Sequence, residues 1–297
     1  MKTLNEEIAA IKAASISKTA KKNALVKLGI TNYEISIILD ADDNITPAAG
    51  RFTFGVEMEC FVARGSIRLA AERTGMAYEY EGYNHRDGHS YFKFTTDGSV
   101  SGMPNPIECV SPVLQGTKGK ADLKKACKTL NKAGAQVNRT CGLHVHIGAA
   151  KLTGKQYANV FVNYMYLENL IDSFMAESRR GTNAYYCQTL QDHHGLTRCN
   201  SIAEVQREMG IRANGHPRYH KVNAMAYDRH KTIEFRQHQG TTDYDKIINW
   251  VNFCGKLVNW SKSNRLTAHV ASIDEIPFLS EAEKEFFKAR ASHFASR

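Results

Sequence analysis

The sequence FTFGVEMECFV, at residues 52–62, alternates between apolar and more polar side chains with a period of two. Because successive side chains of a β-strand point to opposite faces, Phe54 and Met58 would share one face, and Glu57 and Glu59 the other. Two like charges on one strand face repel each other unless a cation or water separates them. The stretch is therefore either a solvated edge strand with two surface glutamates or one wall of a cation site.

Two later stretches repeat this pattern of one apolar face and one ionisable face. They are CGLHVHI at residues 141–147 and TIEFRQHQG at residues 232–240. An ordinary solvated sheet face would draw more on Thr, Lys, Ser and Gln. If the three stretches share one sheet, their ionisable faces form a cluster able to bind cations and anions. The ionisable residues that alternation places on this front face are His144, His146, Glu234, Arg236 and His238.

Length and composition exclude several classes of protein. The 297 residues are 42% hydrophobic, which is enough to bury one large core or two small ones. No apolar run approaches the length of a membrane span, and the first residues lack the apolar region of a signal peptide. Seven scattered cysteines indicate reduced thiols, so a cytoplasmic location is expected. The formal charge of +9 favours anionic partners, either nucleotides or nucleic acid.

The chain is expected to divide into a small helical leader and one large domain. Residues 1–45 show helical spacing of apolar side chains, with a third helix beginning near residue 31, and they are rich in lysine. That basic leader is either a solvated helical surface or a contact for nucleic acid. Residues 41–50 have the composition of a linker, and the large domain is expected at 51–297.

The large domain mixes helical and strand patterns, which predicts an α+β fold with an antiparallel-leaning sheet. The region 180–215 is predicted to be an irregular polar loop, either a lid over the site or a structured surface insertion. Helices are expected at 66–74, 121–133, 155–179, 245–262 and from 280 onward, and further strands at 76–83, 91–96, 107–110 and 220–227.

The front-face side chains favour a metal bound through oxygen. Glutamate carboxylates suit Mg²⁺, which commonly bridges to substrate phosphates. One histidine among them is compatible with Mg²⁺ or Mn²⁺, whereas zinc prefers more nitrogen or sulfur. Arg236, two residues after Glu234, could offer a planar fork to a phosphate, or could simply pair with a glutamate. Lys221 and Asn223, on the preceding strand, either face this site and touch phosphate or form an exposed pair.

Several other residues are expected to carry no chemistry. Cys109 and Cys141 lie next to motif residues but point, by alternation, into the apolar side or mark a strand start. A second group could suggest zinc, but its spacing fits no standard zinc pattern. Its members are Cys187, His193, His194 and Cys199.

Four motifs in this order resemble the amidoligases of bacteria and phages: FGVEMEC, IECVSP, CGLHVHI and TIEFRQHQGT. That family is grouped with glutamine synthetase and glutamate–cysteine ligase among the carboxylate–amine ligases. The resemblance covers about residues 52–260 and leaves out the leader and the tail. It implies an α+β fold of the glutamine synthetase catalytic-domain type, with helices packed on an antiparallel-leaning sheet.

The resemblance also implies roles for individual residues. Arg236 is similar to the arginine that neutralises a transferred phosphoryl group, with Glu234 beside it in the catalytic site. His146 would lie near the nucleotide phosphates, where we also place Lys221 and Arg236. Asp97 of TDGS is aligned more loosely. The residues that resemble the family's metal ligands are Glu57, Glu59, Glu108, His144 and Glu234.

The implied activity is ATP-dependent formation of an amide or isopeptide bond, with Mg²⁺ or Mn²⁺ as cofactor. The carboxylate of a small-molecule or peptide acid would attack the γ-phosphate of ATP, and an amine would then displace phosphate from the acyl phosphate. The region 180–215, where acid and amine would be recognised, diverges from the family. The sequence therefore leaves the identity of both substrates open.

Three other functions compete with this interpretation. A phosphotransferase on the same fold would use the same metals and arginine but no amine. A basic nucleic-acid-binding protein with a vestigial site would use the lysine-rich leader, but it would leave the ionisable sheet face unexplained. A zinc hydrolase or cupin built on His144 and His146 is disfavoured, because the next acidic residue is Glu168, far along a predicted helix.

Overall fold

The computed structural model describes residues 3–14, 18–29, 52–82, 88–96, 98–182, 185–211 and 216–296. By its internal contacts the chain divides into two compact units, Met1–Arg51 and Phe52–Arg297, which are described separately. The expected third helix of the leader, the linker at 41–50 and Asp97 lie outside the described residues. In the described part of the chain, every helix is too short or too polar to cross a membrane.

Within the described residues of the first unit lie the helices α1 (Leu4–Ala13) and α2 (Lys18–Lys27). A reciprocal capping box begins α1: the Glu6 amide donates to Thr3 Oγ1 at 3.3 Å, and the Thr3 amide donates to the Glu6 carboxylate at 2.8 Å. Such a box satisfies backbone donors that the first helical turn leaves unpaired. The helical spacing read from the sequence therefore corresponds to real helices in this segment.

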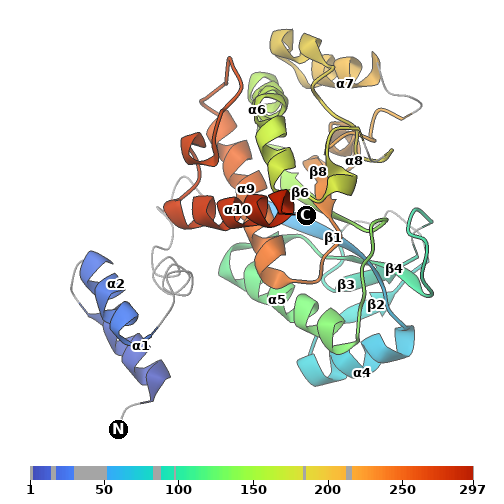
Figure 1. Cartoon of the computed structure of the whole chain (residues 1–297). Helices are drawn as coiled ribbons and strands as arrows, with labels where there is room; N and C mark the ends of the chain where they lie inside the picture. The colour runs from blue at the N-terminus through green and yellow to red at the C-terminus, as the bar shows by residue number, and fades with distance from the viewer. Residues whose placement is uncertain are drawn as a thin grey trace. The chain divides into compact units, whose positions relative to one another are not determined.

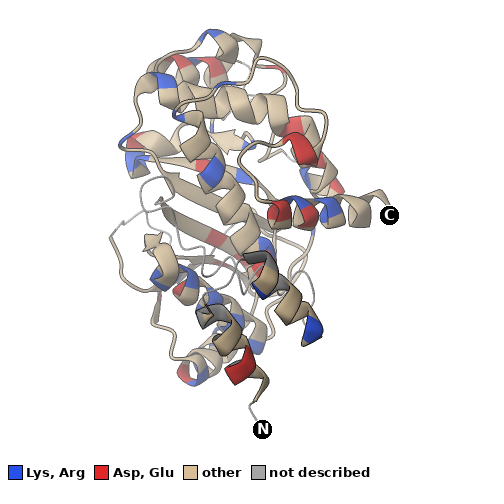
Figure 2. Ribbon diagram, turned by 90° about the vertical axis from the view of Figure 1, so that its left-hand side faces the viewer, with Lys and Arg blue, Asp and Glu red and all other residues tan. Residues whose placement is uncertain are grey.

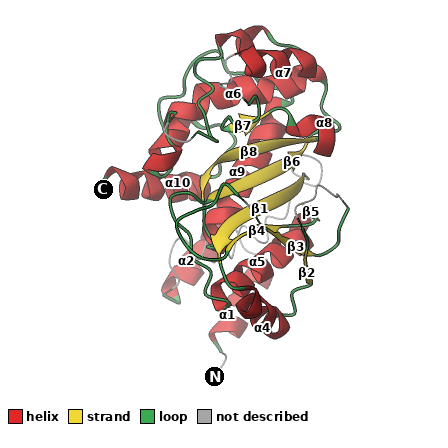
Figure 3. Ribbon diagram, turned by 90° about the vertical axis from the view of Figure 1, so that its right-hand side faces the viewer, coloured by secondary structure: helices red, strands yellow, loops and turns green. Residues whose placement is uncertain are grey.

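The second unit is organised around β1 (Thr53–Phe61), the strand predicted from FTFGVEMECFV. The strand order is β2-β3-β4-β1-β6-β8-β7, with β5 also paired to β1, and the pairs are antiparallel except for β2–β3. The predicted α+β class with a mainly antiparallel sheet is confirmed (Figure 3). The other strands are β2 (Tyr78–Tyr80), β3 (Phe92–Thr95), β4 (Pro106–Val110), β5 (Leu114–Gln115), β6 (Gly142–Gly148), β7 (Val222–Asn223) and β8 (Thr232–Gln239).

Helices cover the back of this sheet (Figure 1). Met58, Val145 and Phe235 from three strands share one buried core with Leu123 of α5 and Trp250 of α9. Each such side chain stabilises the fold by about 1.5–3 kcal/mol on burial. The back face therefore supplies the packing that holds the sheet, and the front face can carry polar side chains. The helices of this unit are α4 (Arg64–Thr74), α5 (Gly116–Lys132), α6 (Gly154–Ser173), α7 (Ile202–Ile211), α8 (Ala226–His230), α9 (Tyr244–Ser261) and α10 (Glu281–Ala295).

The chain between α6 and β8 differs from the prediction. The helix expected at 155–179 ends at Ser173, and a short 3₁₀ turn follows at Glu177–Arg179. The strand expected at 220–227 is only Val222–Asn223, and α8 follows it directly. The region 180–215 is not wholly irregular, because α7 lies within it.

A capping pattern in the sequence explains α7. The Ser201 amide donates to the Glu204 carboxylate at 3.2 Å, and the Glu204 amide donates to Ser201 Oγ at 3.2 Å. Val205 and Met209, four residues apart, are both buried. These are the start signal and the apolar spacing of an amphipathic helix, so the pattern was available in the sequence.

A β-bulge between β6 and β8 overturns one prediction about faces. Leu143 pairs with His238 and Val145 pairs with Phe235, so β8 has one more residue than β6 in this interval. The extra residue reverses the alternation beyond the bulge. His238 therefore does not share the front face with Arg236, as alternation predicted. It lies on the back, 2% exposed, with its ring 5.9 Å from that of Trp250.

The buried His238 is expected to make the fold sensitive to acid. Burial lowers its pKa to about 3, so between pH 6.5 and 3 the unfolded chain binds a proton that the folded chain does not. Stability then falls as the pH drops through this window, by up to about 1.4 kcal/mol per pH unit from this residue. We expect His238→Asn to flatten the pH dependence of the unfolding free energy measured in urea, while His269→Asn, an exposed control, leaves the slope unchanged. Equal slopes in all three proteins would contradict this account.

Candidate functional site

The front of the sheet forms the floor of a cavity of about 1130 Å³. Ligand pockets commonly occupy 300–1,000 Å³, so this one has room for more than one small molecule. Its lining includes the expected front-face residues of the motifs except Lys221 and His238. These lining residues are Glu57, Glu59, Glu108, His144, His146, Asn223, Glu234 and Arg236.

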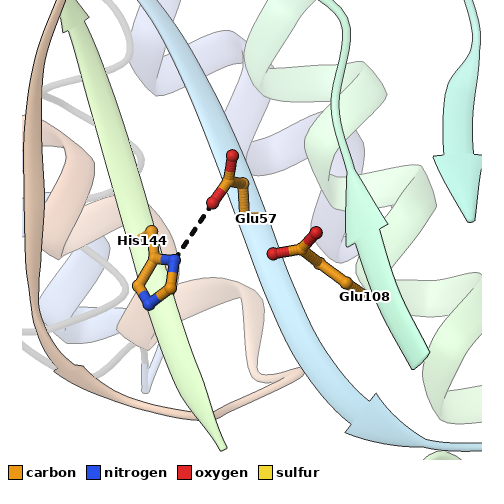
Figure 4. A group of neighbouring side chains, drawn as sticks. All are labelled: Glu57, Glu108 and His144. Atoms are coloured by element: carbon orange, nitrogen blue, oxygen red, sulfur yellow. Dashed lines mark hydrogen bonds and ion pairs between the residues drawn. The ribbon is translucent and has the colours of Figure 1, made fainter. Parts of the chain in front are cut away.

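Strand register brings the ionisable side chains together. Glu57 on β1 pairs with His144 on β6, and on the other side of β1 Glu59 pairs with Glu108 on β4. Directly paired residues of antiparallel strands point to the same face with neighbouring Cβ atoms. Figure 4 shows the result: Glu57 lies between His144 and Glu108, and its carboxylate is bonded to the imidazole.

Glu57 contributes to two overlapping groups of metal-type donors. The first contains Glu57, Glu108 and His144, and the second contains Glu57, His146 and Glu234. In each group one donor atom per residue lies within 4.8 Å of the others. Glu57 Oε2 is 3.0 Å from His144 Nδ1, and Glu57 Oε1 is 3.4 Å from His146 Nε2. The arrangement offers two adjacent donor groups, sharing one carboxylate, that could each hold a cation.

The charges in the cluster favour a cation. Burial alone would raise the pKa of Glu57, but its bonds to His144 and His146 outweigh this and hold the pKa well below its usual range. Burial alone would lower the pKa of His146, but Glu57 and Glu234 outweigh this and raise it. Positive charge is therefore stabilised between these side chains, whether a proton or a metal ion carries it.

The donor set fits a divalent metal. His146 Nδ1 lies 2.9 Å from Thr232 Oγ1, which fixes the ring, and its buried Nε2 makes no aligned hydrogen bond among the described residues, with Glu57 Oε1 3.4 Å away. Metal-binding histidines are commonly oriented in this way through the other ring nitrogen. Carboxylates with few nitrogens and no sulfur suit Mg²⁺ or Mn²⁺ better than zinc.

Glu59 lies beside the two groups and belongs to neither of them. Its Oε2 accepts a hydrogen bond from the Gly142 amide at 2.5 Å, and its Oε1 is 3.6 Å from His144 Nε2. Buried at 4% exposure, it ties β1 to the start of β6.

Arg236 projects from β8 into the same cavity. Its Nη1 pairs with Glu234 Oε1, and its Nε donates to the Tyr186 carbonyl at 3.3 Å. Burial would lower its pKa, but Glu234 and Glu57 outweigh this and raise it, so the guanidinium stays charged. Asn223 on β7 donates to the other oxygen of Glu234, which fixes that carboxylate between two donors.

Lys221 is a correction to the predicted site. It does not line the cavity: its Nζ donates to Glu168 Oε1 at 2.8 Å and to Asp172 Oδ1 at 2.6 Å, and its side chain is fully buried. These carboxylates lie four residues apart and hence on one face of α6, where they draw the long lysine side chain away from the sheet front. The sequence pattern of the strand alone could not reveal this competing ion pair.

The region proposed as a lid contributes an aromatic wall that the sequence only partly indicated. Tyr185 and Tyr186 line the cavity and contact Tyr219, with ring centroids 5.5 and 4.8 Å from it. By contrast, Cys187 and Cys199 are buried, and neither joins His193 or His194 in a metal-type group among the described residues.

Comparison with known proteins identifies the family. The model of a family described as "Putative amidoligase enzyme" matches residues 50–258. The chain belongs to this amidoligase family. The match covers the whole cavity floor, from β1 to most of α9, and leaves out α1, α2 and α10. No curated protein matches the chain.

Two solved structures are similar to this amidoligase-family chain at low identity. One is a bifunctional glutathione synthetase from Pasteurella multocida, with 10% identity and a TM-score of 0.40, covering 82% of this chain and 47% of the other. The second is a novel glutamine synthase homologue, with 12% identity and a TM-score of 0.39, covering 84% and 67% respectively. The chain thus spans less than half the length of the first protein.

Proposed function

We propose that the chain is an ATP-dependent carboxylate–amine ligase, with the activity in residues 51–297 and residues 1–45 as a separate leader. One observation carries the proposal: two metal-type donor groups that share Glu57 lie beside the charged Arg236 in a single large cavity. Membership of the amidoligase family supports the bond type. The substrates proposed are small-molecule or peptide acids and amines, and the free, buried cysteines support a cytoplasmic location.

The proposed roles follow from the contacts. Glu57, Glu108, His144, His146 and Glu234 would hold Mg²⁺ or Mn²⁺, with Glu59 beside them. When bound, the metal would offset the negative charge of the ATP phosphates. Arg236 would donate from its guanidinium to the phosphoryl group as that group moves to the carboxylate of the acid.

The aromatic wall would protect the intermediate. An acyl phosphate formed from the acid and ATP hydrolyses if water reaches it before the amine does. Tyr185, Tyr186 and Tyr219 pack edge to face along one side of the cavity, and the Tyr186 carbonyl accepts from Arg236. Movement of this wall over bound substrates would therefore shift the Tyr186 carbonyl that Arg236 contacts, and with it the position of the guanidinium.

Nucleotide turnover tests the proposal. The full chain is incubated with Mg²⁺, ATP and mixtures of acids and amines, and ADP release is measured together with amide products by mass spectrometry. ADP and amide in equal amounts would support the ligase. ADP with a phosphorylated product and no amide would indicate a phosphotransferase. Along the ribbon of the second unit, Lys and Arg are interspersed with Asp and Glu (Figure 2).

Replacing Arg236 with lysine is expected to slow turnover without abolishing nucleotide binding. Lysine keeps the positive charge next to Glu234 but loses the planar fork that can hold two phosphoryl oxygens. The expected cost is about 2–4 kcal/mol, or roughly 30- to 1000-fold in rate, the usual loss for one transition-state donor. Steady-state ADP release measures this effect, and Arg180→Lys, outside the cavity, is the control. A lysine variant of normal rate would show that Arg236 only balances the charge of Glu234.

A further inference from the structure

Two neighbouring helices on the back of the sheet carry most of the chain's excess positive charge. The 11 residues of α4 include three Arg and one Glu, and the 17 residues of α5 include six Lys and one Asp. Their net charges of +2 and +5 together make +7 of the formal +9 of the whole chain. A charge gathered in this way on one pair of helices indicates an anionic partner.

The two helices lie side by side and form one surface (Figures 1 and 3). Thr74 Oγ1 of α4 and Thr129 Oγ1 of α5 share a hydrogen bond of 2.6 Å. The apolar sides of both helices, with Ile67 of α4 and Leu123 of α5, are buried in the core behind the sheet. The charged side chains are therefore left on the outer side of the pair.

Most of these cations have no acid beside them. In the described part of the chain, Lys118 alone among the basic residues of the two helices forms an ion pair, with Asp122 at 2.6 Å. Burial lowers the pKa of Lys120, and the charge of Lys256 lowers it further, although Glu283 opposes this. Positive charge is thus already crowded on this side of the unit, and a bound anion would relieve the repulsion.

The lysines of the second half of α5 form a row. Lys124, Lys128 and Lys132 are exposed and lie four residues apart, so they follow one face of the helix at steps of about 6 Å. Together with Tyr244 of α9 they line a hollow of about 430 Å³. Lys124 Nζ lies 5.4 Å from the centre of the Tyr244 ring. The row therefore borders a concave part of the surface rather than a flat one.

A phosphate backbone matches this row better than other anions do. Each strand of a nucleic acid carries one phosphate per about 3.4 Å of axis, so cations at steps of about 6 Å can meet different phosphates. The core of a protein–protein interface is depleted in lysine, which disfavours a protein partner. Binding to a membrane surface also needs apolar insertion, and on α4 and α5, which are described in full, Leu69 is the exposed large apolar side chain.

We propose that α4 and α5 form a nucleic-acid-binding face that holds the phosphate backbone of DNA or RNA without reading its sequence. The lysines of α5 would contact successive phosphates, and Arg68 and Arg73 of α4 would hold others. Neither helix, each described over its whole length, contributes a residue to the lining of the cavity on the front of the sheet. The inference therefore does not rest on the proposed ligase function, and nucleic acid on this face leaves the cavity open.

The salt dependence of binding tests the proposal. Fluorescent DNA and RNA duplexes of about 20 base pairs, longer than the roughly 25 Å of α5, are titrated with the full chain at about 50 to 200 mM salt. The variant combines Lys124→Gln, Lys128→Gln and Lys132→Gln. The slope of log affinity against log salt concentration should become shallower by about 2–3, and binding at about 0.1 M salt should weaken roughly 100-fold. Both duplexes should respond, because backbone contacts carry no sequence information.

A matched variant controls for the loss of charge in general. Lys151→Gln, Lys155→Gln and Lys262→Gln together remove three exposed lysines that lie outside α4, α5 and the cavity lining. This variant should keep the wild-type slope. Lysine and glutamine have similar helix propensities, so both triple variants should fold, and thermal melting checks that they do.

Two further variants locate the contact. Arg68→Gln with Arg73→Gln should make the slope shallower by about 1–2, because α4 belongs to the same face. Lys21→Gln with Lys27→Gln, in α2 of the basic leader, should leave it unchanged. An unchanged slope in the α4 variant would overturn the joint face, and loss of binding in the leader variant alone would assign the nucleic acid to the leader instead.

Two more results would contradict the proposal. One is an equal slope for the wild-type chain and the α5 variant. The other is binding to phosphatidylcholine vesicles that contain phosphatidylserine, lost in the α5 variant, while neither duplex binds; this would assign the face to a membrane surface. Stabilisation by Mg²⁺ with ATP should be the same in the wild-type chain and the α5 variant, so a failure of the ligase proposal would leave the nucleic-acid result standing.

Discussion

Replacing Glu57 with glutamine is expected to remove both the activity and the metal-dependent stabilisation of the fold. Glu57 is the residue common to the two metal-type groups and lies against both His144 and His146. An amide of the same shape carries no charge and would weaken both cation positions at once. The loss should be at least about 4 kcal/mol of transition-state stabilisation, or roughly 1000-fold in ADP release.

Thermal melting provides the second measurement of this variant. Mg²⁺ with ATP should stabilise the wild-type chain more than either alone, because the phosphates complete the coordination of the metal. Glu57→Gln should lose most of that shift, and Glu59→Gln should lose less, because Glu59 stands outside both groups. Glu72→Gln on the exposed surface of α4 is the control. Equal shifts in wild type and Glu57→Gln would count against the metal site.

Replacing Lys221 with methionine is expected to destabilise the fold by about 3–5 kcal/mol. Lys221 is the cation between Glu168 and Asp172, and the side chains of Lys221 and Glu168 are 0% and 1% exposed. Methionine fills a similar volume but leaves a buried carboxylate without its counter-charge. Unfolding in urea measures the loss.

The pH dependence of this loss gives a sharper test. Burial raises the pKa of Glu168 even in the wild-type chain, although the Lys221 charge opposes this. Without Lys221 the folded chain should take up a proton at Glu168 more readily, so the destabilisation should shrink as the pH falls. Lys256→Met is the control, because its pair with Glu283 is partly exposed and should contribute at most about 1 kcal/mol. Similar losses in both variants would contradict the role of Lys221.

Alternation was sufficient to predict the centre of the site. Alternation within β1 and β6 predicts that Glu57 and His144 point to the same face of the sheet. The alternating residues of both strands are buried in the core on the opposite face, in agreement with that prediction. Strand pairing then follows from burying those apolar backs against α5 and α9 (Figure 1). The residues of the front face could be predicted from the sequence because side chains alternate regularly between the two faces in that part of the sheet.

Features that depend on partners far along the chain could not be predicted. His238 has the alternation of a front-face residue, but the bulge that turns it to the back exists only in the pairing of β8 with β6. Lys221 is drawn away by two acids on α6, and no strand pattern indicates that contact. Arg179 falls in a stretch where helical periodicity continued past the true end of α6.

Gln237, the residue just after Arg236 at the bulge, links β8 to the turn that carries Arg179 through hydrogen bonds. Its side-chain amide bonds both Asp172 and the Arg179 carbonyl, and its oxygen accepts from Tyr164 of α6. The spacing between the Arg179 and Arg236 main chains is thus set by covalent neighbours and buried hydrogen bonds rather than by mobile loops. Two cations held at a fixed separation in one cavity would favour ligands whose anionic groups lie the same distance apart.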